Sequence, residues 1–346
     1  MTAPAAASSD TQASGPSGRH DRPVLVTGAA GFLGSHLCDR LVESGAVVIG
    51  LDNLSTGHLT HLAGLRGHAR FHFERHDVTE PLPQALREAG AVYNLACPAS
   101  PAYYQRHPID TLLASTLGSW RVLELATAGR ARVLQASTSE VYGDPEQHPQ
   151  HEDYWGHVNP IGPRSCYDEG KRSAEAMCYA YARERGVPVR VARLFNCYGP
   201  RLMPGDGRVV SNFVEQALSG RPFTVYGDGR QTRSFCYVSD TVRALLALMA
   251  CDWEGPVNIG NPREHTVLEL AAVVRTLTRC HVPMHFSPMP VDDPVRRRPD
   301  IETARRVLGW QPQVSLAQGL MQTIAFFRES LARQPMAEHS AAAPPA

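Results

Sequence analysis

A glycine-rich turn near the start of the chain constrains its fold more than any other feature. The apolar run Val24–Thr27 leads into three glycines spaced G-x-x-G-x-x-G, and a helical pattern follows. A second apolar run, Val47–Leu51, ends at Asp52. Because glycines allow a tight turn and a helix N-terminus attracts a pyrophosphate, this strand–helix–strand order predicts a dinucleotide site. The glycines of the turn are Gly28, Gly31 and Gly34.

Asp52 bears on which dinucleotide is bound. It follows the glycine turn by about 20 residues, at the end of the second predicted strand. A carboxylate at this place accepts hydrogen bonds from the ribose hydroxyls of adenosine and repels a 2′-phosphate. The sequence therefore predicts NAD, rather than NADP, as the cofactor.

Strand and helix patterns alternate through the first 200 residues, which predicts an α/β fold with a Rossmann-type doubly wound parallel sheet. We expect an NAD-binding domain over residues 23–200. Residues 201–330 are irregular and rich in Pro and Gly, and we expect them to form mainly a smaller α+β substrate-binding lobe over the carboxyl ends of the strands. The predicted strands are Phe71–Phe73, Ala91–Ala96, Arg132–Ser137 and Val189–Phe195, and the predicted helices are Leu82–Glu88, Ile109–Ala128 and Tyr167–Arg185.

Both ends of the chain have the composition of disordered tails. Residues 1–22 are rich in Ala, Ser, Pro and Gly and lack the basic start and apolar stretch of a signal peptide, and residues 334–346 are similar. No run approaches the roughly 18 apolar residues of a membrane span, so we expect no membrane association. The eight cysteines include no C-x-x-C pair, which favours a reducing cytoplasm.

Charge and metal-ligand patterns argue against other classes of protein. Lys+Arg and Asp+Glu both number 34, so the chain lacks the basic excess of nucleic-acid binders, and we expect no nucleic-acid partner. The 15 histidines form no H-E-x-x-H motif and no Cys/His cluster, so we expect no metal.

Lysine usage marks one position in particular. Of the 34 basic residues 33 are Arg, and only Lys171 is Lys. It is either a random survivor or a position where Arg does not serve. Tyr167 lies four residues earlier, so the two share a face of a predicted helix. An ammonium lowers the pKa of a nearby phenol and can also donate to the nicotinamide ribose, which predicts a general base at Tyr167. Arg would differ in shape and reach.

A polar turn follows the strand predicted before residue 138. Thr138, Ser139 and Glu140 place two hydroxyls and a carboxylate at the carboxyl end of that strand, where parallel sheets bind ligands. The simple structural interpretation is a capped turn. The presence of Tyr167 and Lys171 in the same chain favours a catalytic one.

Several longer motifs carry a resemblance to a known family. The glycine turn and the Tyr/Lys pair are shared by a whole superfamily, whereas the run EDYWGHVNP and the Thr-Ser-Glu turn are much narrower. Over about residues 22–330 the sequence resembles the extended short-chain dehydrogenases, and most of all the UDP-glucuronate decarboxylases among them. The segments that carry the resemblance are Thr27–Gly34, Ser137–Gly143, His151–Pro163, Tyr167–Arg172, Arg193–Pro200, Arg208–Phe213, Tyr226–Asp240 and Asp292–Asp300.

The resemblance implies a specific reaction. Related 4,6-dehydratases carry Asp where Ser139 stands, and related 4-epimerases lack the carboxylate of Glu140. The expected activity is therefore decarboxylation of UDP-glucuronate to UDP-xylose through a 4-keto intermediate, with NAD recycled. A relative that releases the 4-keto product lacks a run like EDYWGHVNP. The alternatives are another sugar-nucleotide 4-epimerase or 4,6-dehydratase, or a non-catalytic NAD-sensing protein, a class that usually loses the Tyr/Lys pair.

The resemblance also implies roles for individual residues. Tyr104 matches a tyrosine near the sugar carboxylate, and Arg297 matches a position around the UDP-sugar, although residues 296–298 could instead be a solvated basic run. Proton donation to C5 is left open between Ser139, Glu140 and an ordered water. A homodimer is expected, in which residues 109–128 and 167–185 of both copies form a four-helix bundle. The implied catalytic residues are Thr138, Ser139, Glu140, Tyr167 and Lys171; the implied cofactor residues are Gly28, Gly31, Phe32, Leu33, Gly34, Asp52, Asn53, Asp77, Val78, Leu95, Tyr167 and Lys171; and the implied substrate residues are Tyr104, Asn196, Arg208, Tyr226, Gln231, Arg233 and Arg297.

Overall fold

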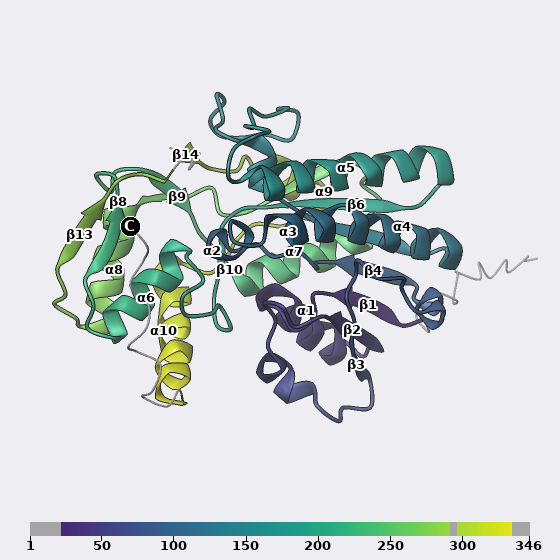
Figure 1. Ribbon diagram of the computed structural model, residues 1–346, viewed down its shortest axis with the longest axis horizontal. Helices are drawn as coiled ribbons and strands as arrows, with labels where there is room; N and C mark the ends of the chain where they lie inside the picture. The colour runs from purple at the N-terminus through teal and green to yellow at the C-terminus, as the bar shows by residue number, and fades with distance from the viewer. Residues whose placement is uncertain (1–21, 291–295, 334–346) are drawn as a thin grey trace, which may run out of the picture.

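A seven-stranded parallel sheet organises the structure, a computed structural model that describes residues 22–290 and 296–333. Its strand order is β11-β6-β5-β4-β1-β2-β3. This is the predicted doubly wound α/β sheet, with the first crossover around the glycine turn (Figure 1). The strands are β1 (Val24–Thr27), β2 (Val48–Asp52), β3 (Phe71–Arg75), β4 (Ala91–Asn94), β5 (Arg132–Thr138), β6 (Val189–Leu194) and β11 (Pro256–Ile259).

Helices cover both faces of this sheet. Helices α4 and α5 pack together on one face of the sheet and α1 and α7 pack together on the other, and the two pairs belong to two different buried clusters (Figure 1). The short helix α3 precedes α4 and packs against α5. The helix bounds are α1 (Phe32–Glu43), α3 (Pro108–Ser115), α4 (Leu117–Gly129), α5 (Ser165–Arg185) and α7 (Val238–Ala250).

Three predicted elements differ from the structure for local reasons. The helix predicted over residues 109–128 is interrupted at Thr116, whose hydroxyl donates to the Leu112 carbonyl, a contact that bends helices. The segment predicted as Leu82–Glu88 is a 3₁₀ helix, η2 (Gln84–Glu88), after Pro83. Strand β4 ends two residues early, because the amides of residues 95 and 96 turn to the Thr27 hydroxyl.

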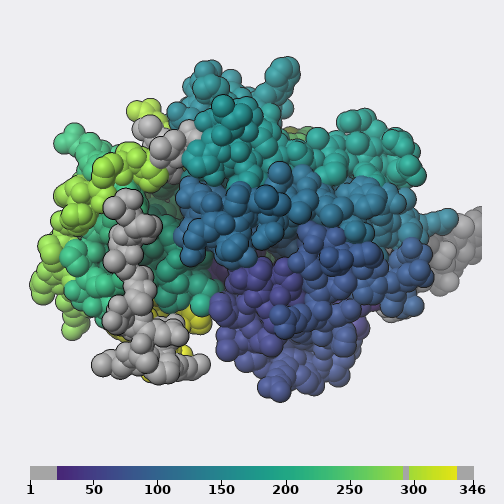
Figure 2. All heavy atoms as spheres, viewed as in Figure 1, coloured from purple at the N-terminus to yellow at the C-terminus, as the bar shows by residue number. Residues whose placement is uncertain are grey.

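The C-terminal part forms a second lobe beside the carboxyl ends of the main strands (Figures 1 and 2). The main sheet includes one strand from beyond residue 200, because β11 pairs with β6. The domain limit expected at residue 200 therefore stays a prediction. The lobe contains strand pairs β8 (Phe223–Tyr226) with β13 (Met284–Ser287) and β7 (Cys197–Tyr198) with β10 (Cys236–Tyr237), the strands β9 (Thr232–Ser234), β12 (Glu264–Thr266) and β14 (Arg296–Arg297), and the helices α6 (Val209–Leu218), α8 (Val267–Thr278), α9 (Glu302–Leu308) and α10 (Leu316–Arg333).

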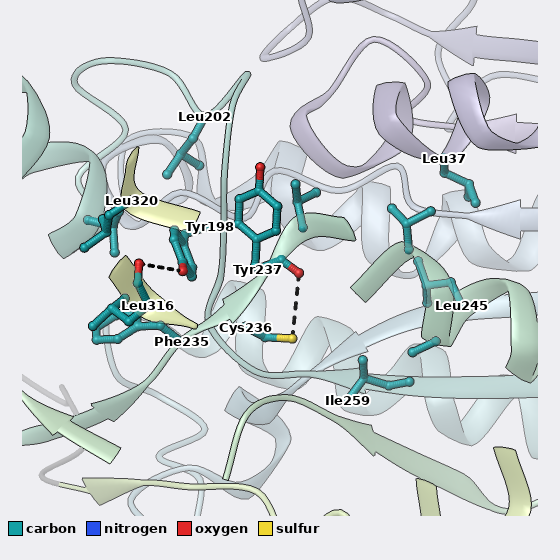
Figure 3. Packing of buried hydrophobic residues seen from close by; sticks show 14 of the residues in the cluster. Leu37, Tyr198, Leu202, Phe235, Cys236, Tyr237, Leu245, Ile259, Leu316 and Leu320 are labelled. Atoms are coloured by element: carbon teal, nitrogen blue, oxygen red, sulfur yellow. Dashed lines mark hydrogen bonds between the residues drawn. The ribbon is translucent and has the colours of Figure 1, made fainter. Parts of the chain in front are cut away.

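One hydrophobic core runs through both lobes. Figure 3 shows Leu37 of α1 and Leu245 of α7 in the same buried cluster as Leu320 of α10. Tyr198 lies between them, fully buried, and its hydroxyl donates to the Leu316 carbonyl at 3.2 Å. Each such side chain contributes about 1.5–3 kcal/mol on burial, so the lobes stabilise one another.

The predicted tails lie almost wholly outside the described residues. Arg22, which composition assigns to the first tail, is held in place. Its guanidinium donates to the carbonyls of Glu88, Ala89 and Gly129. Among the described helices, none is long and apolar enough to cross a membrane.

Candidate active site

The glycine turn has the close backbone approach that its sequence predicts. Gly28 has a φ of 71°, and a Cβ added there would lie 2.9 Å from the Leu95 carbonyl carbon. A Cβ on Gly34 would lie 2.0 Å from the Gly28 carbonyl oxygen. Larger residues therefore do not fit at either position, and the turn packs closely against the start of α1 and the backbone after β4.

Asp52 ends strand β2 beside this turn. Its carboxylate accepts hydrogen bonds from the backbone amides of Ala30 at 3.0 Å and Leu54 at 2.8 Å. Burial raises the pKa of Asp52, and these amide contacts oppose that rise. Nearby, the Asn53 amide donates to Asp77 at 2.7 Å. The carboxylate is thus fixed where a ribose would meet it.

A cleft of about 340 Å³ joins these groups. It brings together most of the expected cofactor residues, namely Gly28, Gly31, Asp52, Asn53, Asp77, Val78 and Leu95. Phe32, Leu33 and Gly34 begin helix α1 behind the turn and do not line the cleft. Sequence reasoning missed Cys97 and Tyr103, which also line it. Their position just after β4, at the carboxyl edge of the sheet, could have indicated them.

Tyr167 and Lys171 lie one turn apart on α5, and both are buried. The Lys171 ammonium is 5.7 Å from the centroid of the Tyr167 ring and donates to the Ala136 carbonyl at 2.9 Å. Burial raises the pKa of Tyr167, the nearby Cys97 thiol adds to the rise, and a hydrogen bond from Thr138 opposes it. The protein groups alone therefore do not give the expected lowering of the Tyr167 pKa. The Lys171 ammonium faces the Tyr167 ring, and burial removes water from the phenol.

The turn after β5 is both capped and part of the site. The Thr138 hydroxyl accepts from the Glu140 amide at 3.3 Å, so the structural interpretation of this turn is correct. Residues 139–142 form a short 3₁₀ helix, η3 (Ser139–Tyr142), in which Ser139 and Glu140 are buried. Because Thr138 also bonds the Tyr167 phenol, the turn and the Tyr/Lys pair form one cluster.

Two arginines hold the Glu140 carboxylate. Arg297 of β14 approaches with both terminal nitrogens, at 2.5 Å and 2.8 Å, and Arg164 donates at 2.6 Å. Burial alone would raise the pKa of Glu140, but the guanidinium groups of Arg297 and Arg164 hold it below its usual range. Arg297 is 5% exposed, so it is not part of a solvated basic run. Sequence reasoning missed Arg164, whose one signal is its place just before Tyr167.

Tyr104 stacks on Tyr167. The two rings are 5.1 Å apart and almost parallel, and the Arg164 guanidinium lies 5.9 Å from the Tyr104 centroid on the same cluster. The Tyr104 hydroxyl is buried and has no hydrogen-bond partner among the described residues. A buried phenol oxygen without a partner is costly, which fits a role in contacting a polar ligand.

The remaining expected substrate residues fall into two places. Arg233 is buried near Glu140, and Arg208 is paired with Asp206 at 2.5 Å and lies 5.9 Å from the Phe32 ring. Asn196 lies directly before β7, and its backbone carbonyl accepts a hydrogen bond from the Cys236 amide. Gln231 lines a separate hollow of about 400 Å³, and its amide donates to the carbonyl of Tyr226, which is half exposed.

Comparison with known proteins identifies the family of this site. The family model described as NAD dependent epimerase/dehydratase family matches residues 24–260. The chain belongs to this NAD-dependent epimerase/dehydratase family. The match takes in the glycine turn, the Thr138–Glu140 turn and the Tyr167/Lys171 pair.

Relatives with reviewed descriptions are similar over most of the chain. UDP-glucuronic acid decarboxylase 1 of Danio rerio is 54% identical over 311 residues, which are 90% of this chain and 74% of the relative. UDP-glucuronic acid decarboxylase 6 of Arabidopsis thaliana is 53% identical over 298 residues, 86% of each chain.

Solved structures confirm the epimerase/dehydratase fold. The UDP-glucose 4-epimerase of Thermotoga maritima, solved with UDP-glucose, has a TM-score of 0.82 and 32% identity, covering 89% of this chain and 99% of that one. The UDP-glucuronic acid 4-epimerase of Bacillus cereus, solved with UDP-glucuronic acid and NAD, has a TM-score of 0.81 and 27% identity over the same shares.

The residues present fit the family's cofactor. Gly28 and Gly34 let the turn pack closely against its own backbone and that of Leu95, Gly28 and Gly31 line the cleft that a pyrophosphate would enter, and Asp52 offers a fixed carboxylate to a ribose. NAD is therefore the cofactor of this epimerase/dehydratase family member, as the sequence predicts. Within residues 22–290 and 296–333, no three His, Cys, Asp or Glu side chains are grouped so as to hold a metal ion.

Proposed function

We propose that the protein is an NAD-dependent UDP-glucuronate decarboxylase that produces UDP-xylose. The observation that carries this proposal is the Glu140 carboxylate, buried between Arg297 and Arg164 one residue after Ser139. A 4,6-dehydratase would need an acid at Ser139, and an epimerase would not need Glu140. Relatives that are more than half identical are UDP-glucuronic acid decarboxylases by name.

The first step needs a base at the sugar 4-hydroxyl. Tyr167 takes this proton, and Thr138 hydrogen-bonds the same oxygen. When bound, NAD supplies the hydride acceptor at C4 and returns the hydride at the end of the cycle. Lys171 sits over the Tyr167 ring, where it stabilises negative charge on the phenolate and holds the nicotinamide ribose. Because burial raises its pKa, the Tyr167 phenol acts as a base only with the Lys171 ammonium and the cofactor in place.

The second step breaks a carbon–carbon bond. A 4-keto glucuronate is a β-keto acid, so its C5 carboxylate leaves as CO2 and an enolate remains. Donors on Tyr167 and Thr138 stabilise the enolate oxygen. C5 then takes a proton, for which Ser139, Glu140 or an ordered water is a candidate. Because Glu140 is held as a carboxylate by Arg297 and Arg164, it serves better in orienting a water than as the acid itself.

Further residues are assigned by place. For the cofactor we propose the cleft residues Gly28, Gly31, Asp52, Asn53, Asp77, Val78 and Leu95, with Phe32, Leu33 and Gly34 behind the turn. For the substrate we propose Tyr104, Asn196, Arg208, Arg233 and Arg297 around the sugar and pyrophosphate, with Tyr226 and Gln231 at the far end of the nucleotide. Guanidinium groups suit phosphate geometry.

We also propose a homodimer formed through α3, α4 and α5. Apolar side chains stand exposed on the first two of these helices, with Ile109 71%, Trp120 42% and Leu112 39% exposed. Helices α3 and α4 both pack against α5, so pairing with a second copy would give the expected bundle. A cytoplasmic location is supported by eight cysteines that are all free thiols.

Product analysis tests the proposed reaction. The purified protein is incubated with UDP-glucuronate and NAD, and the product is identified by NMR while NADH is followed by absorbance. We expect UDP-xylose and CO2 without net NADH at completion. Stoichiometric accumulation of NADH, or UDP-galacturonate as the single product, would overturn the assignment in favour of a dehydrogenase or an epimerase.

A further inference from the structure

The strand that carries Arg297 has little support of its own. Strand β14 is two residues long and pairs with β9 through Arg296 and Arg297. So short a ladder supplies few hydrogen bonds to fix its register. Among the described residues, those that follow Arg297 supply further contacts that fix its backbone.

Gln150 makes those contacts. Its side-chain oxygen accepts from the Arg298 backbone amide at 2.8 Å, and its backbone N–H donates to the Arg298 carbonyl at 2.9 Å. The Gln150 carbonyl accepts from the Asp300 amide at 2.7 Å, and its side-chain nitrogen donates to the Gln147 carbonyl at 2.7 Å. Gln150 is 1% exposed, so water does not compete for these bonds.

Asn258 links this arrangement to the other partner of the ion pair. Its side-chain nitrogen donates to the carbonyls of Gln150 and Asp300, at 3.0 Å and 3.1 Å. Its side-chain oxygen accepts from the Tyr142 hydroxyl at 2.7 Å. Because Tyr142 belongs to the same short helix as Glu140, both ends of the Arg297–Glu140 contact are anchored to one buried network.

We propose that Gln150 is a positioning residue for Arg297, which fixes the backbone beside Arg297 so that its guanidinium meets Glu140 and the substrate. The assignment deepens the proposed function and rests on it. Gln150 does not touch the reacting atoms and acts through Arg297. Its loss should therefore reduce use of the sugar nucleotide and leave the cofactor cleft, whose lining includes no residue of this network, unchanged.

The test compares two glutamines that make similar contacts. Gln216 also uses both polar atoms of its side chain, donating to the Thr224 hydroxyl and accepting from the Thr224 backbone amide, each at 3.0 Å, but it belongs to α6 and contacts β8. Gln150→Met and Gln216→Met thus remove the same kinds of bond near to and far from Arg297. We measure kcat/KM for UDP-glucuronate, NAD affinity and thermal stability for both variants.

We expect kcat/KM of Gln150→Met to fall about 100-fold with NAD affinity unchanged, since displacement by about 1 Å costs on that scale. Gln216→Met should keep wild-type kcat/KM while losing comparable thermal stability. In an Arg297→Ala background, Gln150→Met should have no further effect. A wild-type kcat/KM for folded Gln150→Met, or a full additional loss in the Arg297→Ala background, would overturn the proposal.

A second variant covers failure to fold. Gln150→Asn keeps a polar amide in the pocket but withdraws it by one carbon from the Arg298 amide, so it should show the same loss of kcat/KM. Failure of both Gln150 variants to fold, with Gln216→Met folded, would assign Gln150 to folding and refute the positioning role. If the wild-type protein itself makes no UDP-xylose, the proposed function fails instead, so the two failures are distinguishable.

Discussion

The cofactor side and the substrate side of the site are built in opposite ways. The cofactor side is built mainly from one continuous segment, in which β1, the glycine turn, α1 and β2 span residues 24–52, and Asp77, Val78 and Leu95 add the ends of neighbouring strands. The substrate side joins distant segments, since Glu140 and Arg297 are separated by 157 residues. The first depends on backbone shape and the second on buried charge, so they should fail differently when mutated.

The largest effect is expected at the glycine turn. Gly34→Ala would place a Cβ 2.0 Å from the Gly28 carbonyl oxygen, so the turn must deform and NAD binding should be lost. Titration with NAD, followed by calorimetry, measures this. Gly64→Ala is the matched control, because its Cβ would meet nothing within 4 Å, and it should bind NAD normally. Normal NAD binding by Gly34→Ala would show that the turn is not the pyrophosphate site.

The next effect is expected at Lys171. Lys171→Arg keeps the charge, but a planar guanidinium cannot occupy the place of the ammonium between the Tyr167 ring and the Ala136 carbonyl. Turnover should fall by about 10²–10⁴-fold in a folded protein, the range that general-base catalysis contributes. Raising the pH should restore activity only in part. Near-normal turnover at neutral pH would refute the assigned role.

A smaller loss is expected on the substrate side. Arg297→Ala leaves the Glu140 carboxylate buried with Arg164 bonded to it and Arg233 nearby, and transition-state binding should weaken by about 2–4 kcal/mol. Affinity for NAD should remain at the wild-type level. Steady-state kinetics with UDP-glucuronate measures the loss. If turnover were unaffected, the sugar would have to bind elsewhere.

The smallest effect concerns stability and pH. Burial raises the pKa of Asp168 from its ordinary value of 3.8 to about 7, and the Glu140 carboxylate adds to this rise. Glu169 adds a smaller rise, whereas Arg164 and Arg297 oppose it. The folded state then binds this proton more tightly than the unfolded state, so the free energy of unfolding falls as the pH rises from about 4 to 7.

Asp168→Asn should remove that pH dependence. At pH 8 the variant should be more stable than the wild type by about 1–3 kcal/mol, and the difference should vanish near pH 4. Urea unfolding at several pH values measures it, with Asp228→Asn on the exposed surface as a control. A constant difference at every pH would mean that Asp168 is ionised throughout.

The contrast between the two sides also explains what the sequence could predict. Strands β1 to β6 of the main sheet, the glycine turn and Asp52 follow from local patterns, because each depends on neighbours within a few residues. Tyr167 and Lys171 were found in the same way, by their spacing on one helix. Strand β11 was missed because its four residues carry no distinctive pattern and its place is decided by pairing with β6.

Residues that act through distant contacts gave no local signal. Arg164 and Gln150 lie in irregular segments, and their importance comes from Glu140 and Arg298, whose proximity only the folded chain provides. The direction of the Tyr167 pKa was also missed, because it depends on burial of the phenol more than on its sequence neighbour. The resemblance supplied Arg297 as a site residue but not the network that holds it.

The core shared by the two lobes has a mechanical consequence. A swing of one lobe away from the other would pull Leu316 and Leu320 of α10 off the aromatic rings around Tyr198. At about 1.5–3 kcal/mol for each buried side chain, such a swing is disfavoured by several kcal/mol. The resting molecule therefore keeps its two lobes together, and with them the contact that Arg297 makes with Glu140.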